Sequence, residues 1–404
     1  MIYDVLIVGA GPAGSFAAEC LSRNGVSVCL FDGQAENEPK ACGGGVTTKS
    51  FNYYPQLMHA AARIISSVNL HSPTGRSAYI NLNDPFAIFS RTELDSFLCK
   101  KANYSGTYIV QSRVRLEKFS KHDDGIWNLR ATDGSIWKGK TLVAADGANS
   151  SIARHLVGAI KVEEMEVAFG FRVPLLLKDE TAATIAFLPG YTGYAWAFPR
   201  LDHVSFGIAT AQSRFDHNAL NKLLWLFMIN HYRTLDDRGT KSWRQWHTKN
   251  ESSDDKIIIT RLEANAKRYA ARIPGVSART WETRRVAGKN WALLGDAAGF
   301  ADSVTGEGIF YALRSGELFA KAYLSGDLAS YEKLWRDDFG VELISAAKLR
   351  NRFYGSFIGN PFTERMIQFA RHHNGVKQTL GGLISGEQSY AGLKRKLLMR
   401  AAKI

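Results

Sequence analysis

The head of the chain alternates between short apolar runs and turns of small residues. Residues 5–8 form a continuous apolar run, which is typical of a parallel strand buried on both faces. Three glycines with the spacing G-x-G-x-x-G come next, and they are Gly9, Gly11 and Gly14. Such glycines allow a tight turn and bring backbone N–H groups close to a phosphate, with a helix opening near Pro12. Residues 26–31 predict a second strand ending at Asp32, so the pattern predicts a dinucleotide site whose ribose bonds this carboxylate.

Nine further segments have the alternating or continuously apolar character of strands. They are residues 78–89, 108–116, 126–131, 135–142, 167–173, 183–188, 193–199, 204–209 and 290–294. Apolar positions at helical spacing predict helices from about residue 91 to 102, over 310–324, and over most of the chain beyond residue 327. This order indicates an α/β protein with a separate, strand-rich region in its middle.

The segment 193–199 is dense in aromatic side chains. Tyr194, Trp196 and Phe198 alternate with small residues, and Gly207 lies on the next expected strand. Because alternate residues of a strand point to the same face, Tyr194 and Trp196 share one face. Such a face either belongs to an ordinary sheet core or walls an apolar cavity.

Length and composition describe a globular protein of several domains. At 404 residues, 45% hydrophobic and 22% charged, the chain is expected to form two or three domains. The four cysteines Cys20, Cys29, Cys42 and Cys99 show no C-x-x-C spacing, which favours a reduced, cytoplasmic setting. No apolar run approaches the roughly 18 residues of a membrane span, and the apolar N-terminal stretch is too short for a signal peptide or an anchor. Ten histidines without zinc-type spacing predict no metal site.

A net charge of +13 indicates an anionic partner. Nucleic acid is not expected, because no zinc-finger, helix-turn-helix or RNP motif is present. After Glu387 the chain has no acidic residue, and residues 393–404 combine five cations with an apolar stripe at helical spacing. A short basic amphipathic helix of this kind either docks on its own protein or lies on a membrane surface.

Several turns carry charged or reactive side chains. Asp146-Gly147 ends one buried strand and Gly295-Asp296 another, while Gly306-Glu307-Gly308 opens the 310–324 helix. Free N–H groups at such a helix start suit a polyol or an oxyanion-bearing ring. Arg91 stands at a helix start, where a cation is favourable only beside an anion; otherwise it is an ordinary solvated arginine.

Cys42 precedes three glycines in a segment expected to be a loop. From the local sequence it is either a buried spacer or a functional thiol. The other three cysteines lie within expected helices and strands, where a small apolar residue fits.

Together the glycine-rich turns, with Arg91-x-x-Leu94-Asp95, resemble FAD-binding enzymes of the para-hydroxybenzoate hydroxylase fold. Within that superfamily the chain is similar to the geranylgeranyl reductases. The specific matches are KACGG at 40–44, YAWAFPR at 194–200 and VTGEGI at 304–309. The resemblance covers almost the whole chain and is weakest between residues 210 and 275.

The resemblance implies a Rossmann-type FAD-binding domain with an inserted antiparallel-sheet substrate domain and a helical C-terminal region. The expected boundaries are 1–75, 90–160 and 276–326 for the first domain, 76–89 and 161–275 for the second, and 327–404 for the third. The expected FAD-binding residues are Gly9, Gly11, Pro12, Ala13, Gly14, Asp32, Cys42, Gly43, Gly44, Arg91, Asp146, Gly147, Gly295, Asp296, Gly306, Glu307, Gly308 and Ile309. The expected substrate-binding residues are Tyr194, Trp196, Phe198 and Gly207.

The implied activity is the saturation of carbon–carbon double bonds in a geranylgeranyl or other polyprenyl chain by hydride from reduced FAD. Cys42 matches the family cysteine near flavin and substrate and is expected to be the proton donor or to position it, since an isolated alkene needs a donor. An ordinary thiol, with a pKa of about 8.5, is protonated at neutral pH. The substrate would be a prenyl diphosphate, a prenylated lipid or a quinone, and the external electron donor NADPH or ferredoxin. A cytoplasmic protein in peripheral contact with the inner face of the membrane would fit the net charge.

Two alternatives remain. The sequence Tyr194-x-Trp196-x-x-Pro199 is close to a strand of flavin-dependent halogenases, so an oxygen-using monooxygenase or halogenase on the same fold is the second interpretation. A flavin-bound lipid-binding or resistance protein without turnover is the third.

Overall fold

The computed structural model describes residues 1–34, 40–110, 115–174, 182–235, 253–357, 360–390 and 392–393. They fall into two compact units. Unit 1 comprises Met1–Lys40, Arg91–Glu164 and Ile273–Ala347, and unit 2 comprises Ala41–Ser90, Met165–Arg272 and Lys348–Ile404. The expected basic helix after residue 393 lies outside the described residues.

Unit 1 contains a sheet with the strand order β15-β16-β9-β1-β2-β6, to which the β7–β8 hairpin is joined through β9. The strands are β1 (Ile2–Val8), β2 (Val28–Phe31), β6 (Tyr108–Val110), β7 (Leu116–Lys121), β8 (Trp127–Ala131), β9 (Ile136–Ala144), β15 (Ala287–Gly288) and β16 (Trp291–Leu293). The five strands from β16 to β6 pair in parallel. The apolar run that predicted β1 is buried, as a central parallel strand requires.

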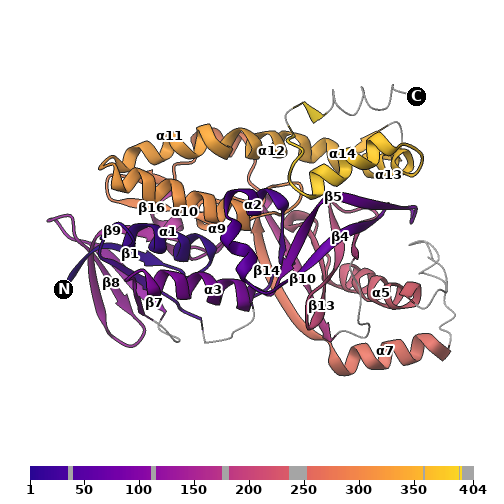
Figure 1. The fold of residues 1–404 in the computed structure, drawn as a ribbon, viewed down its shortest axis with the longest axis horizontal. Helices are drawn as coiled ribbons and strands as arrows, with labels where there is room; N and C mark the ends of the chain where they lie inside the picture. The colour runs from indigo at the N-terminus through magenta and orange to yellow at the C-terminus, as the bar shows by residue number, and fades with distance from the viewer. Residues whose placement is uncertain are drawn as a thin grey trace. The chain divides into compact units, whose positions relative to one another are not determined.

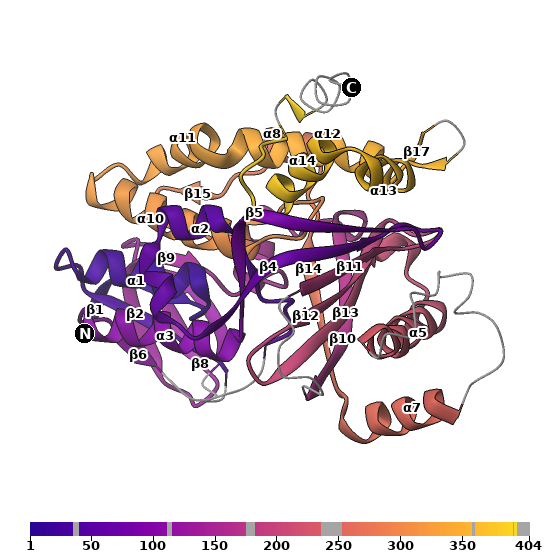
Figure 2. The ribbon, with the colours of Figure 1, turned by 45° about the vertical axis from the view of Figure 1, so that its right-hand side comes forward.

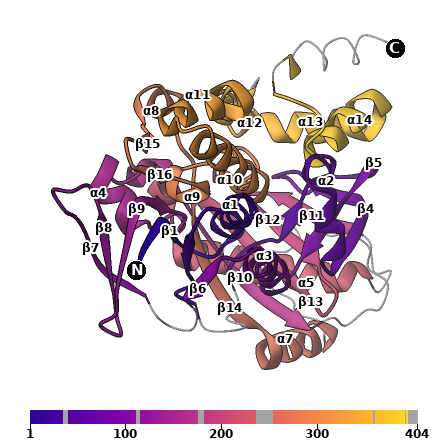
Figure 3. The same cartoon turned by 60° about the vertical axis from the view of Figure 1, so that its left-hand side comes forward.

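Helices pack on this sheet, as Figures 1 and 3 show for α1 and α10. The helices of unit 1 are α1 (Pro12–Ser22), α3 (Arg91–Tyr104), α4 (Ser151–Val157), α8 (Ala278–Thr283), α9 (Gly295–Ala298), α10 (Ile309–Leu324) and α11 (Tyr331–Trp335). Gly316 of α10 has no room for a side chain, because a Cβ there would lie 2.7 Å from the carbonyl oxygen of Ala13. This close approach holds α10 against the first turn of α1.

Unit 2 contains a second sheet with the order β14-β10-β13-β12-β11-β4-β5-β3. Its strands are β3 (Gly45–Val46), β4 (Ala62–His71), β5 (Ser77–Phe89), β10 (Met165–Pro174), β11 (Ala182–Phe187), β12 (Gly193–Pro199), β13 (His203–Ala211) and β14 (Lys267–Pro274). Neighbouring strands from β10 to β11 are antiparallel, whereas β11 and β4 pair in parallel. The sheet is therefore mixed.

Helix α5 (His217–Leu235) covers one face of this sheet (Figure 2). Ala195 and Ala197 of β12 and Phe206 of β13 pack there against Leu224 and Phe227 of the helix. The remaining helices of this unit are α2 (Thr48–Tyr53), α7 (Ser253–Asn265), α13 (Phe362–His372) and α14 (Asn374–Ile384), while α12 (Val341–Phe353) begins in unit 1 and ends in unit 2. The aromatic residues of β12 lie on the other face of the strand.

The mixed α/β class and the helical C-terminal region agree with the expectation from sequence. Two features differ. Residues 62–71, placed by sequence in the nucleotide-binding domain, form β4 of the second sheet, because they pair with β5 and β11. Within the region expected to be mostly helical, β17 (Ser356–Phe357) and β18 (Asn360–Pro361) form a two-strand antiparallel pairing. Among the described residues, no helix has both the length and the apolar character to cross a bilayer.

Candidate functional site

The sequence-predicted turns of unit 1 gather at one edge of its sheet. Gly9 follows β1, Asp32 follows β2, Asp146 lies two residues after β9, and Gly295 lies two residues after β16. These four strands are parallel neighbours in the order β16-β9-β1-β2, so their carboxyl ends share one edge. Ligands of open parallel sheets bind at this edge.

The glycine turn after β1 combines two crowded positions with one open position. A Cβ at Gly9 would lie 2.2 Å from the carbonyl oxygen of Ala145, and one at Gly14 would lie 1.9 Å from that of Gly9. A Cβ at Gly11, by contrast, would meet among the described residues only the tips of two cations, 3.9 Å from Lys40 Nζ and 4.0 Å from Arg91 Nη2. The N-terminus of α1 therefore opens toward positive charge.

Lys40 and Arg91 share one carboxylate, that of Asp95. Lys40 Nζ lies 2.6 Å from Asp95 Oδ2, and Arg91 donates from Nε and Nη2 to the two carboxylate oxygens at 3.0 Å each. Burial alone would raise the pKa of Asp95, but the two cations outweigh it and lower that pKa. The two cations place positive charge beside the start of α1, which suits a diphosphate.

A second helix start, that of α10, belongs to the same edge. Asp302 folds the preceding loop, because its Oδ1 accepts from the N–H groups of Val304 at 2.7 Å and Thr305 at 2.9 Å. Gly308 is the N-cap of α10, and a Cβ on it would lie 3.2 Å from Asp296 Oδ1. Burial raises the pKa of Asp296 to about 6, against the lowering effect of Arg91.

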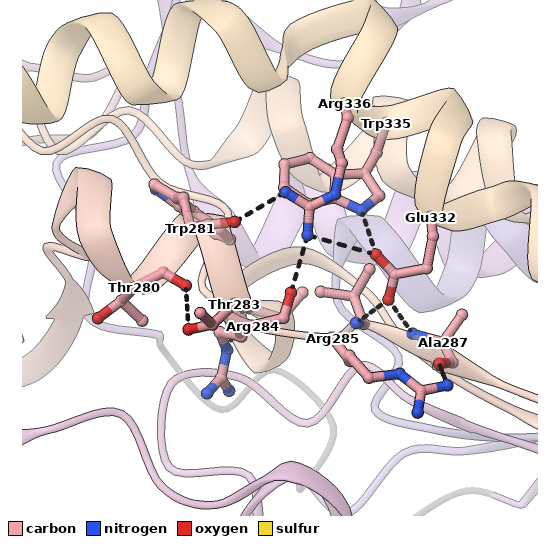
Figure 4. A network of polar contacts seen from close by, with 11 residues as sticks. Thr280, Trp281, Thr283, Arg284, Arg285, Ala287, Glu332, Trp335 and Arg336 are labelled. Atoms are coloured by element: carbon pink, nitrogen blue, oxygen red, sulfur yellow. Dashed lines mark hydrogen bonds and ion pairs between the residues drawn. The ribbon is translucent and has the colours of Figure 1, made fainter.

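A polar network supports the segment that leads into β16 (Figure 4). Glu332 of α11 accepts hydrogen bonds from the N–H groups of Val286 and Ala287, and Arg336 donates to the carbonyl oxygens of Trp281 and Arg284. The buried Arg284 in turn donates from Nε to the Ala298 carbonyl oxygen at 2.9 Å. The network thus fixes α9, which carries Asp296.

These residues fit an FAD. The open face of Gly11 and its two cations suit the diphosphate, and Asp32 at the end of β2 suits a ribose hydroxyl. The N-terminal N–H groups of α10, with Gly306 and Gly308 before them, suit an electron-rich ring. The donors needed at each end of a dinucleotide are thus present in unit 1.

In unit 2 the aromatic face of β12 lies against a pair of glycines. Trp196 is opposite Gly207 of β13, and a Cβ on Gly207 would lie 2.1 Å from Trp196 Cζ2, so the indole packs on the bare backbone. Gly207 pairs in turn with Gly170 of β10, whose Cβ would lie 2.7 Å from the hydroxyl of Tyr269. Trp196 and Tyr269 therefore approach this glycine pair from two sides.

The Cys42–Gly44 loop packs on the same aromatic face. A Cβ on Gly43 would lie 3.2 Å from the Phe198 ring and 3.6 Å from Trp196 Nε1. Arg200 Nη2 donates to the carbonyl oxygens of Cys42 at 2.6 Å and Gly43 at 3.2 Å. Trp196 is buried beside the loop, whereas Tyr194 and Phe198 are half-buried. The structure thus brings Cys42 to the aromatic residues singled out from sequence.

The structure also adds residues that sequence reasoning did not assign to the site. In the sequence Lys40 is one residue of the KACGG motif and Asp95 stands beside Arg91, although an Arg–Asp pair four residues apart on a helix predicts contact. Nothing in the sequence singled out Gly170 or Tyr269. Burial raises the pKa of Tyr269 to about 12, and its hydroxyl donates to the Phe206 carbonyl oxygen at 2.8 Å.

Residues 2–183 match a protein-family model described as an FAD binding domain. The geranylgeranyl diphosphate reductase of Synechocystis sp. is 28% identical over 388 residues, covering 88% of this chain and 86% of that protein. A geranylgeranyl bacteriochlorophyll reductase-like structure from Thermoplasma acidophilum has a TM-score of 0.76 at 18% identity and covers 99% of both chains. The flavin-dependent brominase Bmp2 has a TM-score of 0.65 at 17% identity over both full chains.

Proposed function

Because the chain is a flavin-dependent oxidoreductase similar to the geranylgeranyl reductases, we propose that it saturates carbon–carbon double bonds of a geranylgeranyl or related polyprenyl chain. Bound, reduced FAD would supply the hydride. The observation that carries the proposal is the packing of the Cys42–Gly44 loop on Trp196 and Phe198. An isolated alkene offers no polar group for recognition, so its binding depends on apolar walls and its reduction on a nearby proton donor.

Each part of the chain has a distinct task in this proposal. Lys40 and Arg91 bind the diphosphate of the cofactor at the start of α1, and Asp32 bonds the adenosine ribose. Tyr194 and Phe198, both half-buried, border the prenyl chain. Cys42 donates the proton that completes the saturation.

The test is anaerobic turnover by the full-length protein. Dithionite-reduced protein is mixed with geranylgeranyl diphosphate, and the product mass is followed. We expect a gain of two hydrogens per double bond, lost or reduced at least tenfold in Cys42→Ser. The matched control is Cys20→Ala, which removes another half-buried thiol and should keep wild-type turnover.

The second candidate is an oxygen-dependent halogenase or monooxygenase. It is favoured by the Tyr194-x-Trp196-x-x-Pro199 sequence and by the fold shared with the brominase. A product that gains oxygen or halogen, only when air and halide are present, would select it and exclude the reductase. Prenyl-chain binding with no turnover under either condition would select a non-catalytic lipid-binding protein.

The electron donor and the membrane are further parts of the proposal. NADPH and reduced ferredoxin are compared directly, with bleaching of the flavin absorbance as the measure. The net charge of +13 supports peripheral contact with an anionic membrane. Co-sedimentation with phosphatidylglycerol vesicles but not phosphatidylcholine vesicles, lost in a chain truncated after residue 393, would agree with it.

A further inference from the structure

The loop that carries Cys42 is held by one buried cation. Arg200 follows β12 and is 3% exposed, and its own backbone is fixed by a bond from its N–H to the His203 carbonyl oxygen at 2.7 Å. Arg63 Nε donates to the Arg200 carbonyl oxygen at 2.8 Å. The guanidinium itself bonds the carbonyl oxygens of Cys42 and Gly43. A buried arginine bonded to two loop carbonyls is a fixed charge rather than a mobile surface group.

The same peptide group that accepts from Arg200 also donates to the thiol. Arg200 bonds the carbonyl oxygen of Gly43, and the N–H on the other side of that peptide bond belongs to Gly44. This Gly44 N–H donates to Cys42 Sγ at 3.3 Å. A cation bonded to a peptide carbonyl polarises that peptide and strengthens the bond made by its N–H. The positive charge therefore reaches the sulfur through a single peptide unit.

We propose that Arg200 is a positioning residue that stabilises the Cys42 thiolate through the Gly43–Gly44 peptide. The inference rests on the proposed function only for the identity of the proton acceptor. When the S–H bond breaks, the proton goes to the alkene carbon opposite the one that receives hydride from the reduced flavin, and the electron pair stays on sulfur. The polarised Gly44 N–H then bonds a full negative charge, and water later returns the proton.

His203 and Tyr269, which both interact electrostatically with Arg200, keep their charge between pH 7 and pH 10, and burial lowers the pKa of His203 below its usual value. Tyr269 interacts electrostatically with Cys42, and because burial raises its pKa to about 12 it is neutral between pH 7 and pH 10. The Arg172 guanidinium lies 5.5 Å from the Tyr269 ring centroid and stays charged throughout. Arg63 Nε bonds the backbone carbonyl oxygen of Arg200 and not the loop. A change in thiolate reactivity on substitution of Arg200 is therefore assigned to Arg200.

The test measures alkylation of Cys42 by iodoacetamide in the full-length protein at pH 7 and at pH 10. Only the thiolate reacts, so the ratio of the two rates reports thiolate stabilisation, while the rate at pH 10 reports access. We expect Arg200→Gln to lower the pH 7 to pH 10 ratio at least fivefold. Cys42→Ser supplies the background from the other cysteines, among which burial raises the pKa of Cys20 and of Cys29 to about 12.

Two further variants make the outcome decisive. Arg63→Gln removes a neighbouring cation without touching the loop carbonyls and should keep the ratio within twofold. Arg200→Lys keeps a charge but lacks the planar fork, so it should lower the ratio at least twofold, and it carries the test if the glutamine variant does not fold. Ratios equal to wild type in the folded variants overturn the inference.

The two proposals fail separately. If the Arg200 variants alter the pH 7 to pH 10 ratio of alkylation rates but the protein saturates no prenyl chain, the Arg200 inference holds and the reductase proposal is wrong. If the wild-type protein saturates a prenyl chain but the Arg200 variants keep the wild-type ratio, the reductase proposal holds and the Arg200 inference is wrong. If both hold, Arg200→Gln should lower kcat at least tenfold and change KM less than threefold, because the charge on sulfur develops only in the transition state.

Discussion

Replacing Glu332 by alanine removes one carboxylate that bonds four donors. Its Oε1 accepts from the N–H groups of Val286 and Ala287, and its Oε2 accepts from Trp335 Nε1 at 3.2 Å and lies 3.6 Å from Arg336 Nη2 (Figure 4). Val286 and Ala287 are 0% and 1% exposed, so water cannot take the place of the lost acceptor.

The loss of stability arises from the two buried backbone N–H groups that lose their hydrogen-bond acceptor. Each buried donor left without an acceptor costs about 1–3 kcal/mol, so Glu332→Ala should destabilise unit 1 by about 2–6 kcal/mol. A unit of this size loses about 2–4 °C of melting temperature per kcal/mol, which gives a drop of roughly 4–24 °C. Glu332→Gln keeps one oxygen for the backbone but turns an NH2 group toward Trp335, so it should cost about 1–2 kcal/mol.

Circular dichroism during heating measures the melting temperature, and hydrogen exchange of a peptide over residues 284–290 localises the effect. Glu317→Ala is the control, because Glu317 is 40% exposed and pairs with a partly exposed cation, Arg314. Exposed ion pairs contribute about 0–1 kcal/mol. If the melting temperatures of Glu332→Ala and Glu317→Ala agree within 1 °C, the assigned role of Glu332 is refuted.

Three other substitutions test the site itself. Arg91→Gln should raise the dissociation constant of FAD about tenfold at low salt, with a smaller difference in 0.5 M NaCl, by fluorescence titration. Gly207→Ala puts a Cβ 2.1 Å from Trp196 Cζ2 and should cost about 1–3 kcal/mol and shift tryptophan fluorescence, whereas Gly45→Ala, with ordinary contacts at 3.7 Å, should do neither. Burial raises the pKa of Asp296 to about 6, so protonation of Asp296 stabilises the apoprotein below that pH. Measured relative to Asp296→Asn, this gain in stability is at most about 3 kcal/mol and should vanish as the pH rises through 6.

The strand ends of unit 1 were predictable because their signals are local. A buried apolar run followed by glycines or an acid marks the end of a parallel strand, as at Gly9, Asp32 and Gly295. Parallel strands of one sheet end at the same edge, so no long-range contact had to be known. Of the two cations near Gly11, only Arg91 was singled out from the sequence, because Lys40 pairs with Asp95, which is 55 positions away in the chain.

The second sheet shows where such reasoning stops. Tyr269 reaches the Gly170–Gly207 pair from β14, and that contact depends on the register of three strands separated by long stretches of chain. The alternation of β12 places Trp196 on a face but does not say which backbone it meets. The same limit applies to glycine itself, because Gly14 is required by a carbonyl oxygen 1.9 Å from its missing Cβ and Gly207 by an indole. Only the strand register distinguishes a glycine that allows close packing of a helix from one that packs against an aromatic ring. The role of Arg200 cannot be predicted from the sequence for the same reason.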